Sequence, residues 1–147
     1  MIRIIAIVII VLLIGIQFVP VSKTNPPVTG EIKAPEDVMQ ILRTSCYDCH
    51  SNEVKWPWYS NIAPASWLVV YDVNEAREHL NFSEWQSYSA EDQAEDIEEI
   101  WEEIEEGEMP LWYYLIAHSE AELSDENKET IKNWVHSTSS QHEELSD

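Results

Sequence analysis

Two cysteines and a histidine in the first half of the chain stand at a spacing that could hold a metal cofactor. The segment reads Cys46-Tyr47-Asp48-Cys49-His50, and the whole chain has 2 cysteines. This C-x-x-C-H pattern is typical of the attachment site of a covalent c-type haem. Two thiols three residues apart can reach the two vinyl groups of one porphyrin, and the next imidazole can ligate the iron. We therefore expect one haem c, bonded to Cys46 and Cys49, with His50 as the proximal iron ligand.

Three other uses of the cysteine pair fit the sequence less well. A structural zinc site needs four ligands, usually in two paired clusters, and the chain has no second C-x-x-C pair. A thiol redox motif would begin a helix in a βαβ setting, whereas here the pair follows an expected helix and no strands are evident. A plain disulfide between Cys46 and Cys49 stays open as an alternative.

A haem that carries electrons usually has a second axial ligand, which is a histidine or a methionine. Met109 is the best candidate, because Gly107-Glu108-Met109-Pro110 forms a loop between two expected helices. A methionine that only fills the core is the alternative, but polar and helix-breaking neighbours argue against a simple core position. His79 is the alternative distal ligand, and His118 or an open coordination site follows it.

Arg77 and His79 could also serve the carboxylates of a haem. A buried propionate is costly unless a cation or a hydrogen-bond donor pairs with it. Arg77 is equally well explained by an ordinary surface ion pair with Glu75 or Glu78.

The elements that must position these residues are helical. A helix beginning near Pro35 is expected to run into Cys46, because apolar residues recur on one of its faces. Ser89 caps a second helix, which Gly107 ends. A third helix begins after Ser124. The inward-facing residues expected on the second and third helices are Ala90, Ala94, Ile97, Trp101, Ile104, Ile131, Trp134 and Val135.

Between the first two of these helices lies a long region rich in aromatic residues, from residue 51 to residue 88, with a short helix expected near 65–76. A connection of that length is unusual unless it wraps something, and a haem needs flat apolar walls. No β-alternation is visible. The sequence therefore predicts an all-α fold whose helices surround one covalently bound haem.

The N-terminus looks unlike the rest of the chain. From Ile4 to Val19 only Gln17 is polar. A helix from Ile4 to Val21 would be about 27 Å long, close to the thickness of the hydrocarbon core of a bilayer. The run ends without the small residues of a cleavage site. We therefore expect residues 1–23 to form a transmembrane anchor, with a cleaved signal peptide as the alternative.

The remaining 124 residues (147 minus 23) are enough for one domain. Residues 24–34 contain two adjacent prolines and no apolar periodicity, which is typical of an extended linker. The haem-binding domain is expected to cover residues 35–137. Residues 138–147 are polar and are expected to form a frayed tail.

The net charge of the chain is −20, from 8 basic and 28 acidic side chains. Such a charge argues against a nucleic-acid partner and favours a basic one. Between Ser89 and Pro110 there are 11 acidic residues and no lysine or arginine. This stretch is either a solvated helix face or a surface that attracts a basic redox partner.

The order of these motifs resembles that of a class I cytochrome c, and more narrowly that of the bacterial haem-binding domain family of small, membrane-anchored monohaem proteins. The resemblance implies that Cys46 and Cys49 are thioether sites, that His50 is the proximal ligand and that Met109 is the distal ligand. It covers most of residues 24–134. The segments that carry it are Thr24-Asn25-Pro26-Pro27, Ser45-Cys46-Tyr47-Asp48-Cys49-His50-Ser51-Asn52, Trp56-Pro57-Trp58-Tyr59-Ser60, Leu80-Asn81-Phe82-Ser83 and Gly107-Glu108-Met109-Pro110.

These observations together predict a membrane-anchored monohaem c-type cytochrome that transfers single electrons and is not itself an enzyme. Haem c is attached outside the cytoplasm, so we expect the domain on the extracytoplasmic, periplasmic face of the bacterial inner membrane. The alternative is a haem-based sensor, or a haem protein that reacts with peroxide or gases, whose sixth ligand is labile or absent.

Overall fold

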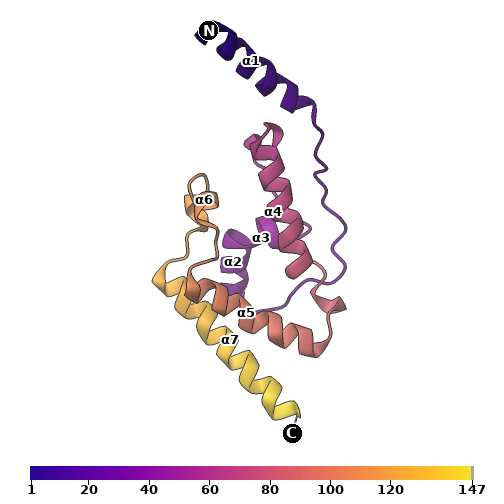
Figure 1. Cartoon of the computed structure of the whole chain (residues 1–147). Coiled ribbons are helices and arrows are strands. Elements are labelled where there is room, and N and C mark those ends of the chain that lie inside the picture. The colour runs from indigo at the N-terminus through magenta and orange to yellow at the C-terminus, as the bar shows by residue number, and fades with distance from the viewer. Residues whose placement is uncertain (147) are drawn as a thin grey trace.

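The computed structural model describes residues 1–146, with side-chain surroundings defined for residues 1–140. Within that range the chain forms seven α-helices joined by extended segments and short 3₁₀ turns, and it has no strand (Figure 1). The all-α prediction is confirmed. In Figure 1, α4 and α6 lie on opposite sides of the short helix α3, while α5 and α7 lie side by side below it.

The N-terminal apolar run forms a shorter helix than predicted. α1 covers Ile2–Gly15, has no buried residue and projects away from the other helices (Figure 1). It is followed by one 3₁₀ turn, Ile16–Phe18, and by extended chain from Val19. In that turn the side-chain amide of Gln17 donates a hydrogen bond of 3.0 Å to the carbonyl of Ala63. The same amide accepts a hydrogen bond of 3.0 Å from the backbone N–H of Ala63. These contacts and Pro20 end the helical run early.

A helix of 14 residues is about 21 Å long, which is less than the roughly 30 Å of a hydrocarbon core. Among the residues described, no helix combines the length and the apolar character that crossing a membrane requires. The predicted transmembrane helix in residues 1–23 is therefore wrong, and so is the single-pass N-terminal anchor on which the predicted localisation was based.

The segment predicted as a linker is extended, but it is held against the domain. The backbone N–H groups of Thr29 and Gly30 both donate to the carbonyl of Ser83 at 3.0 Å, and Ile32 N–H donates to the carbonyl of Phe82 at 2.9 Å. Ile32 is only 2% exposed and joins the core. Periodicity could not reveal this, because an extended chain that packs through its backbone shows no helical pattern.

α2 covers Glu36–Ser45 and buries Val38, Ile41 and Leu42, as its apolar spacing predicted. It contacts α7 and leads directly into α3, Tyr47–His50. The core packs these α2 residues against Phe82 and against apolar residues of α5 and α7.

α4 covers Ala65–His79, so it is longer than the short helix expected there. α5 covers Ala90–Glu106 and begins with the predicted Ser89 cap, whose side chain accepts from the N–H of Asp92. Gly107 ends it with φ 79°, a left-handed conformation that favours glycine. The buried face of α5 contains Ile97 and Ile104 as predicted, together with Ile100. Of the other residues predicted to face inward, Ala94 and Trp101 are half-buried and Ala90 is exposed.

α6 is a single turn, Trp112–Leu115, without any buried residue. α7 covers Asp125–Ser146 and packs against α5. Its predicted inward residues Ile131, Trp134 and Val135 are all buried. The helix continues through most of the segment expected to be a frayed tail, and Asp147 lies outside the described residues.

Candidate functional site

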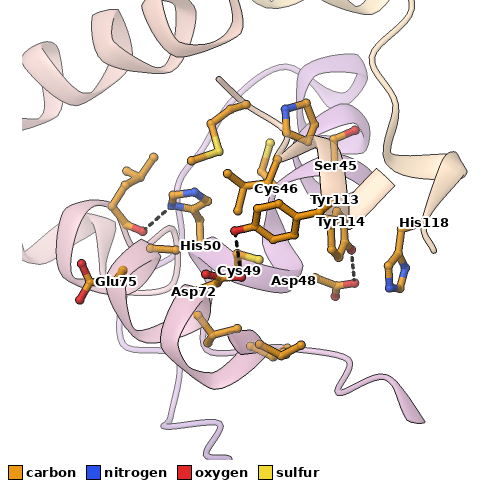
Figure 2. Close-up of a pocket in the computed structure, with 18 of the residues that line it drawn as sticks. Ser45, Cys46, Asp48, Cys49, His50, Asp72, Glu75, Tyr113, Tyr114 and His118 are labelled. Carbon is orange, nitrogen blue, oxygen red and sulfur yellow. Dashed lines mark hydrogen bonds between the residues drawn. The ribbon is translucent and has the colours of Figure 1, made fainter. Parts of the chain in front are cut away.

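One large cavity collects the residues that the C-x-x-C-H pattern singled out. Its volume is about 690 Å³, within the range of small-molecule and cofactor sites. Its walls come from the end of α2, from α3, α4 and α5, and from the segment that contains α6 (Figure 2). Every predicted ligand lines it: Cys46, Cys49, His50, His79, Met109 and His118.

The imidazole of His50 is oriented by the backbone. Its Nδ1 lies 3.1 Å from the carbonyl oxygen of Leu80, drawn as a dashed line in Figure 2. Because a carbonyl only accepts, Nδ1 carries the proton and Nε2 keeps a free lone pair. Histidines that bind metals are usually oriented in this way. Burial lowers the pKa of His50, which favours the neutral form that can ligate a metal.

A second backbone contact joins the segment of His50 to residues 80–82. The N–H of Phe82 donates to the carbonyl of His50 at 2.9 Å. The Phe82 ring stacks on Tyr47 at 5.3 Å between centroids and lies 6.1 Å from the His50 ring, tilted by 52°. The histidine is thus held by backbone hydrogen bonds on one side and by aromatic packing on another.

Buried polar residues tie this region together. Asn81 donates from its side chain to Oδ1 of Asn52 at 3.0 Å and accepts from the N–H of Ser83 at 3.0 Å. The hydroxyl of Ser83 accepts from the N–H of Asn52 at 2.9 Å. All three residues are at most 4% exposed. In a low-dielectric interior such a network is costly to break, so it specifies the local geometry.

The two thiols are free, so no disulfide joins Cys46 and Cys49. Burial raises the pKa of each thiol to about 12, with a smaller contribution from Cys49 in one case and from Asp48 in the other. In residues 1–140, whose side chains the structure describes, no three histidine, cysteine or carboxylate side chains gather as a metal cluster.

Met109 follows directly on the cap that ends α5. The N–H groups of Glu108 and Met109 donate to the carbonyl of Glu103 at 3.0 and 3.1 Å. This turn depends on the left-handed conformation of Gly107 and places Met109, which is half-buried, at the cavity wall.

The other candidate ligands differ in their surroundings. His79 is exposed at the end of α4, although it lines the cavity. His118 has partners on both ring nitrogens: the hydroxyl of Tyr59 lies 2.7 Å from Nε2, and Glu120 lies 3.3 Å from Nδ1. A histidine engaged on both nitrogens has no free lone pair for iron.

Arg77 serves a role that the sequence did not suggest. Its guanidinium donates to the carbonyl of Ser51 at 2.7 Å, to the carbonyl of Thr24 at 3.0 Å and to Oδ1 of Asn25 at 3.3 Å. The side chain therefore fastens the extended N-terminal segment to the residue that follows His50.

Two tyrosines of the site were missed by the sequence analysis. The hydroxyl of Tyr113 donates to Asp72 at 3.2 Å, and that of Tyr114 donates to Asp48 at 3.0 Å (Figure 2). Both tyrosines line the cavity. Asp48 lies within the C-x-x-C-H segment, which is the one signal that could have drawn attention to its partner.

The cavity is negatively charged at its rim. Lys55 is the only lysine or arginine in its described lining, against six carboxylates. Burial and neighbouring carboxylates, chiefly Glu99, raise the pKa of Asp96 to about 6. The pKa values of Asp72 and Glu103 are also raised by burial. The six carboxylates are Asp48, Asp72, Glu75, Asp96, Glu99 and Glu103.

The donor set fits a haem. The cavity offers an imidazole whose Nδ1 is engaged by a backbone carbonyl, two free thiols, a thioether and a predominantly apolar lining. Comparison with known families agrees, because the sequence model of a haem-binding domain matches residues 11–137. No curated protein and no solved structure matches the chain.

Proposed function

This chain belongs to the haem-binding domain family, and from that premise we propose that it is a monohaem c-type cytochrome that transfers single electrons. The chain binds haem. We further propose that one haem is attached through thioether bonds at Cys46 and Cys49. In this proposal the chain carries electrons and has no enzymatic activity of its own.

The orientation of His50 is the main support for this proposal. Its Nδ1 is engaged by the Leu80 carbonyl, so its Nε2 is left for a ligand in the same cavity that both thiols line. In a zinc site the cysteines and the histidine would converge with a fourth ligand on one ion. The described residues contain no such cluster. A cofactor that uses the thiols and the imidazole separately explains the arrangement better.

Each residue then has a distinct task. When bound, haem supplies an iron that gains and loses one electron. Cys46 and Cys49 would hold the porphyrin, His50 would ligate the iron, and Met109 would supply its second protein ligand. A histidine and methionine pair raises the reduction potential and limits access of other ligands, which suits an electron carrier. Phe82, at 1% exposure, packs beside the His50 ring.

The acidic helix α5 supports a basic redox partner. Its residues Asp96, Glu99 and Glu103 line the cavity, so negative charge lies beside the cofactor as well as along the helix. Complementary charge raises the rate at which two redox proteins meet, and salt weakens the effect.

Expression in a host competent for cytochrome maturation tests the assignment of the thiols. The purified chain should gain the mass of one haem and stay coloured after denaturation. The double variant Cys46→Ser/Cys49→Ser should lose that covalent mass. Colourless wild-type protein with free thiols would refute the covalent assignment.

The optical spectrum tests the second ligand. Low-spin ferric protein should show the far-red methionine-to-iron band, and Met109→Leu should abolish it while side-chain volume is nearly kept. Met39→Leu is the matched control, because Met39 packs against the core on α2 and does not line the cavity. If Met39→Leu abolishes the band and Met109→Leu does not, Met109 is not the ligand.

A second candidate function is a sensor or a peroxide- or gas-reactive haem protein with a labile sixth ligand. One observation favours it: no residue from Met109 to His118 is buried, so the segment that supplies the sixth ligand packs weakly. A high-spin ferric spectrum, with ready binding of cyanide or, once reduced, of carbon monoxide, would support this candidate.

A further inference from the structure

The segment from Met109 to His118 closes one side of the cavity without contributing to the core. α6 has no buried residue: its first side chain, Trp112, is 75% exposed, and Ile116, directly after it, is 76% exposed. Burial of apolar area is the main source of local stability in a fold. A segment without it must be held in place by other contacts.

Three side-chain hydrogen bonds provide those contacts, and each reaches a different element. Tyr113 donates to Asp72 of α4 at 3.2 Å, and Tyr114 donates to Asp48 of α3 at 3.0 Å. The third joins His118 to the hydroxyl of Tyr59, in the 3₁₀ turn Trp58–Asn61, at 2.7 Å. Figure 2 shows the two tyrosine bonds as dashed lines on one side of the cavity.

The three bonds support one another. The rings of Tyr114 and His118 stack at 4.2 Å with 10° between their planes, so the histidine that binds Tyr59 also packs on the tyrosine that binds Asp48. Two of the acceptors are carboxylates, and hydrogen bonds to charged groups are stronger than neutral ones.

We propose that Tyr113, Tyr114 and His118 are positioning residues that hold this segment across the cavity and so determine how firmly Met109 stays at the iron. The inference rests on the proposed function, in which Met109 is the second axial ligand. Because Met109 lies in the same segment, four residues before Tyr113, release of the tyrosines gives its side chain freedom to leave.

Tyrosine-to-phenylalanine variants isolate the hydrogen bonds, because they remove one oxygen and keep the ring. Cyanide can bind ferric iron only when Met109 has left, so its binding rate reports the fraction of open segment. We expect Tyr113→Phe and Tyr114→Phe each to raise that rate about tenfold, the factor that corresponds to about 1.4 kcal/mol. The double variant should reach about 100-fold, with a weaker methionine-to-iron band.

Tyr71→Phe is the matched control. Tyr71 also lines the cavity and is 60% exposed, and in the described part of the chain its hydroxyl has no hydrogen-bond partner. Its cyanide rate should equal that of the wild type. A second pair tests the acceptor: Asp72→Asn keeps an oxygen for Tyr113 but loses the charge, so its cyanide rate should lie between those of the wild type and Tyr113→Phe, whereas Asp72→Ala should resemble Tyr113→Phe.

Equal cyanide rates in the wild type, the double variant and Tyr71→Phe would overturn the inference while leaving haem attachment intact. A wild-type protein that carries haem without a methionine band would overturn both the role of Met109 and this inference. Amide hydrogen exchange of residues 109–118 tests the hydrogen bonds even without haem. Faster exchange in the double variant than in Tyr71→Phe supports the inference, and equal exchange overturns it.

Discussion

His50 and Met109 line the same cavity, but the segments that carry them are held in different ways. The surroundings of His50, which we call the His50 side, consist of backbone hydrogen bonds to Leu80 and Phe82 and of a buried polar network. The Met109 side, residues 107–118, has no buried residue and is held by a helix cap and three side-chain bonds.

The difference separates a fixed ligand from an adjustable one. A buried hydrogen bond is costly to lose, because the groups left behind have no water to replace their partners. A bond at a partly exposed rim is lost at small cost, because water takes the vacated position. Local opening therefore starts on the Met109 side, where few apolar contacts oppose it.

The largest effect should come from the buried network. Asn81→Ala leaves Oδ1 of Asn52 and the N–H of Ser83 without their partners. We expect the free energy of unfolding to fall by about 2–4 kcal/mol, measured by urea denaturation. Asn74→Ala, at an exposed position of α4, is the control and should change stability by less than about 0.5 kcal/mol. If Asn81→Ala is as mild as Asn74→Ala, the His50 side is not the rigid one.

Arg77→Met should have the next largest effect. It keeps a long apolar side chain and removes the hydrogen bonds to Ser51, Thr24 and Asn25. We expect a loss of about 1–2 kcal/mol in urea denaturation and faster proteolysis near residue 24. Unchanged proteolysis would show that this side chain does not hold the N-terminal segment.

Gly107→Ala examines the helix cap on the Met109 side. Glycine there has φ 79°, and an added Cβ would meet no atom within 4 Å, so the cost is backbone strain alone. We expect a loss of about 1 kcal/mol and a weaker methionine-to-iron band. Gly15→Ala also meets no atom within 4 Å, lies in α1 and should leave both measurements unchanged. A strong band in Gly107→Ala would show that the cap does not position Met109.

The smallest effect should be a pH dependence. The pKa of Asp96 is raised from 3.8 to about 6, so the folded state keeps a proton that the unfolded state has lost. The resulting contribution of Asp96 to the free energy of unfolding is complete below about pH 4 and disappears as the pH rises through about 6. Because Asp96 is only half-buried, solvent screening limits the change to less than about 1 kcal/mol. Between about pH 4 and pH 7 the free energy of unfolding of the wild type should fall relative to that of Asp96→Asn, measured by urea denaturation. A difference that stays constant with pH would contradict this prediction.

The sequence predicted the parts of the fold that follow local rules. Ser89 and Gly107 marked the ends of α5, and the apolar spacing gave the buried faces of α2 and α7. The C-x-x-C-H segment, Met109, His79 and His118 all line one cavity, and their roles as haem ligands stay predictions.

What the sequence did not reveal depends on contacts between distant residues. The packing of residues 24–32 depends on backbone hydrogen bonds, which leave no pattern in side-chain type. The partners Tyr113 and Asp72 lie 41 positions apart, and nothing in either local sequence points to the other. The early end of α1 depends in part on the contact of Gln17 with Ala63, 46 positions away, which hydrophobicity alone cannot show.

The carbonyl that orients His50 also determines when, during synthesis of the chain, this region can fold. Leu80 comes 30 positions after His50, so the imidazole leaves the ribosome 30 residues ahead of the carbonyl that orients it. During that interval the C-x-x-C-H segment is accessible to whatever enzyme modifies it. Only when residues 80–83 have been synthesised can the two halves of this region close on each other.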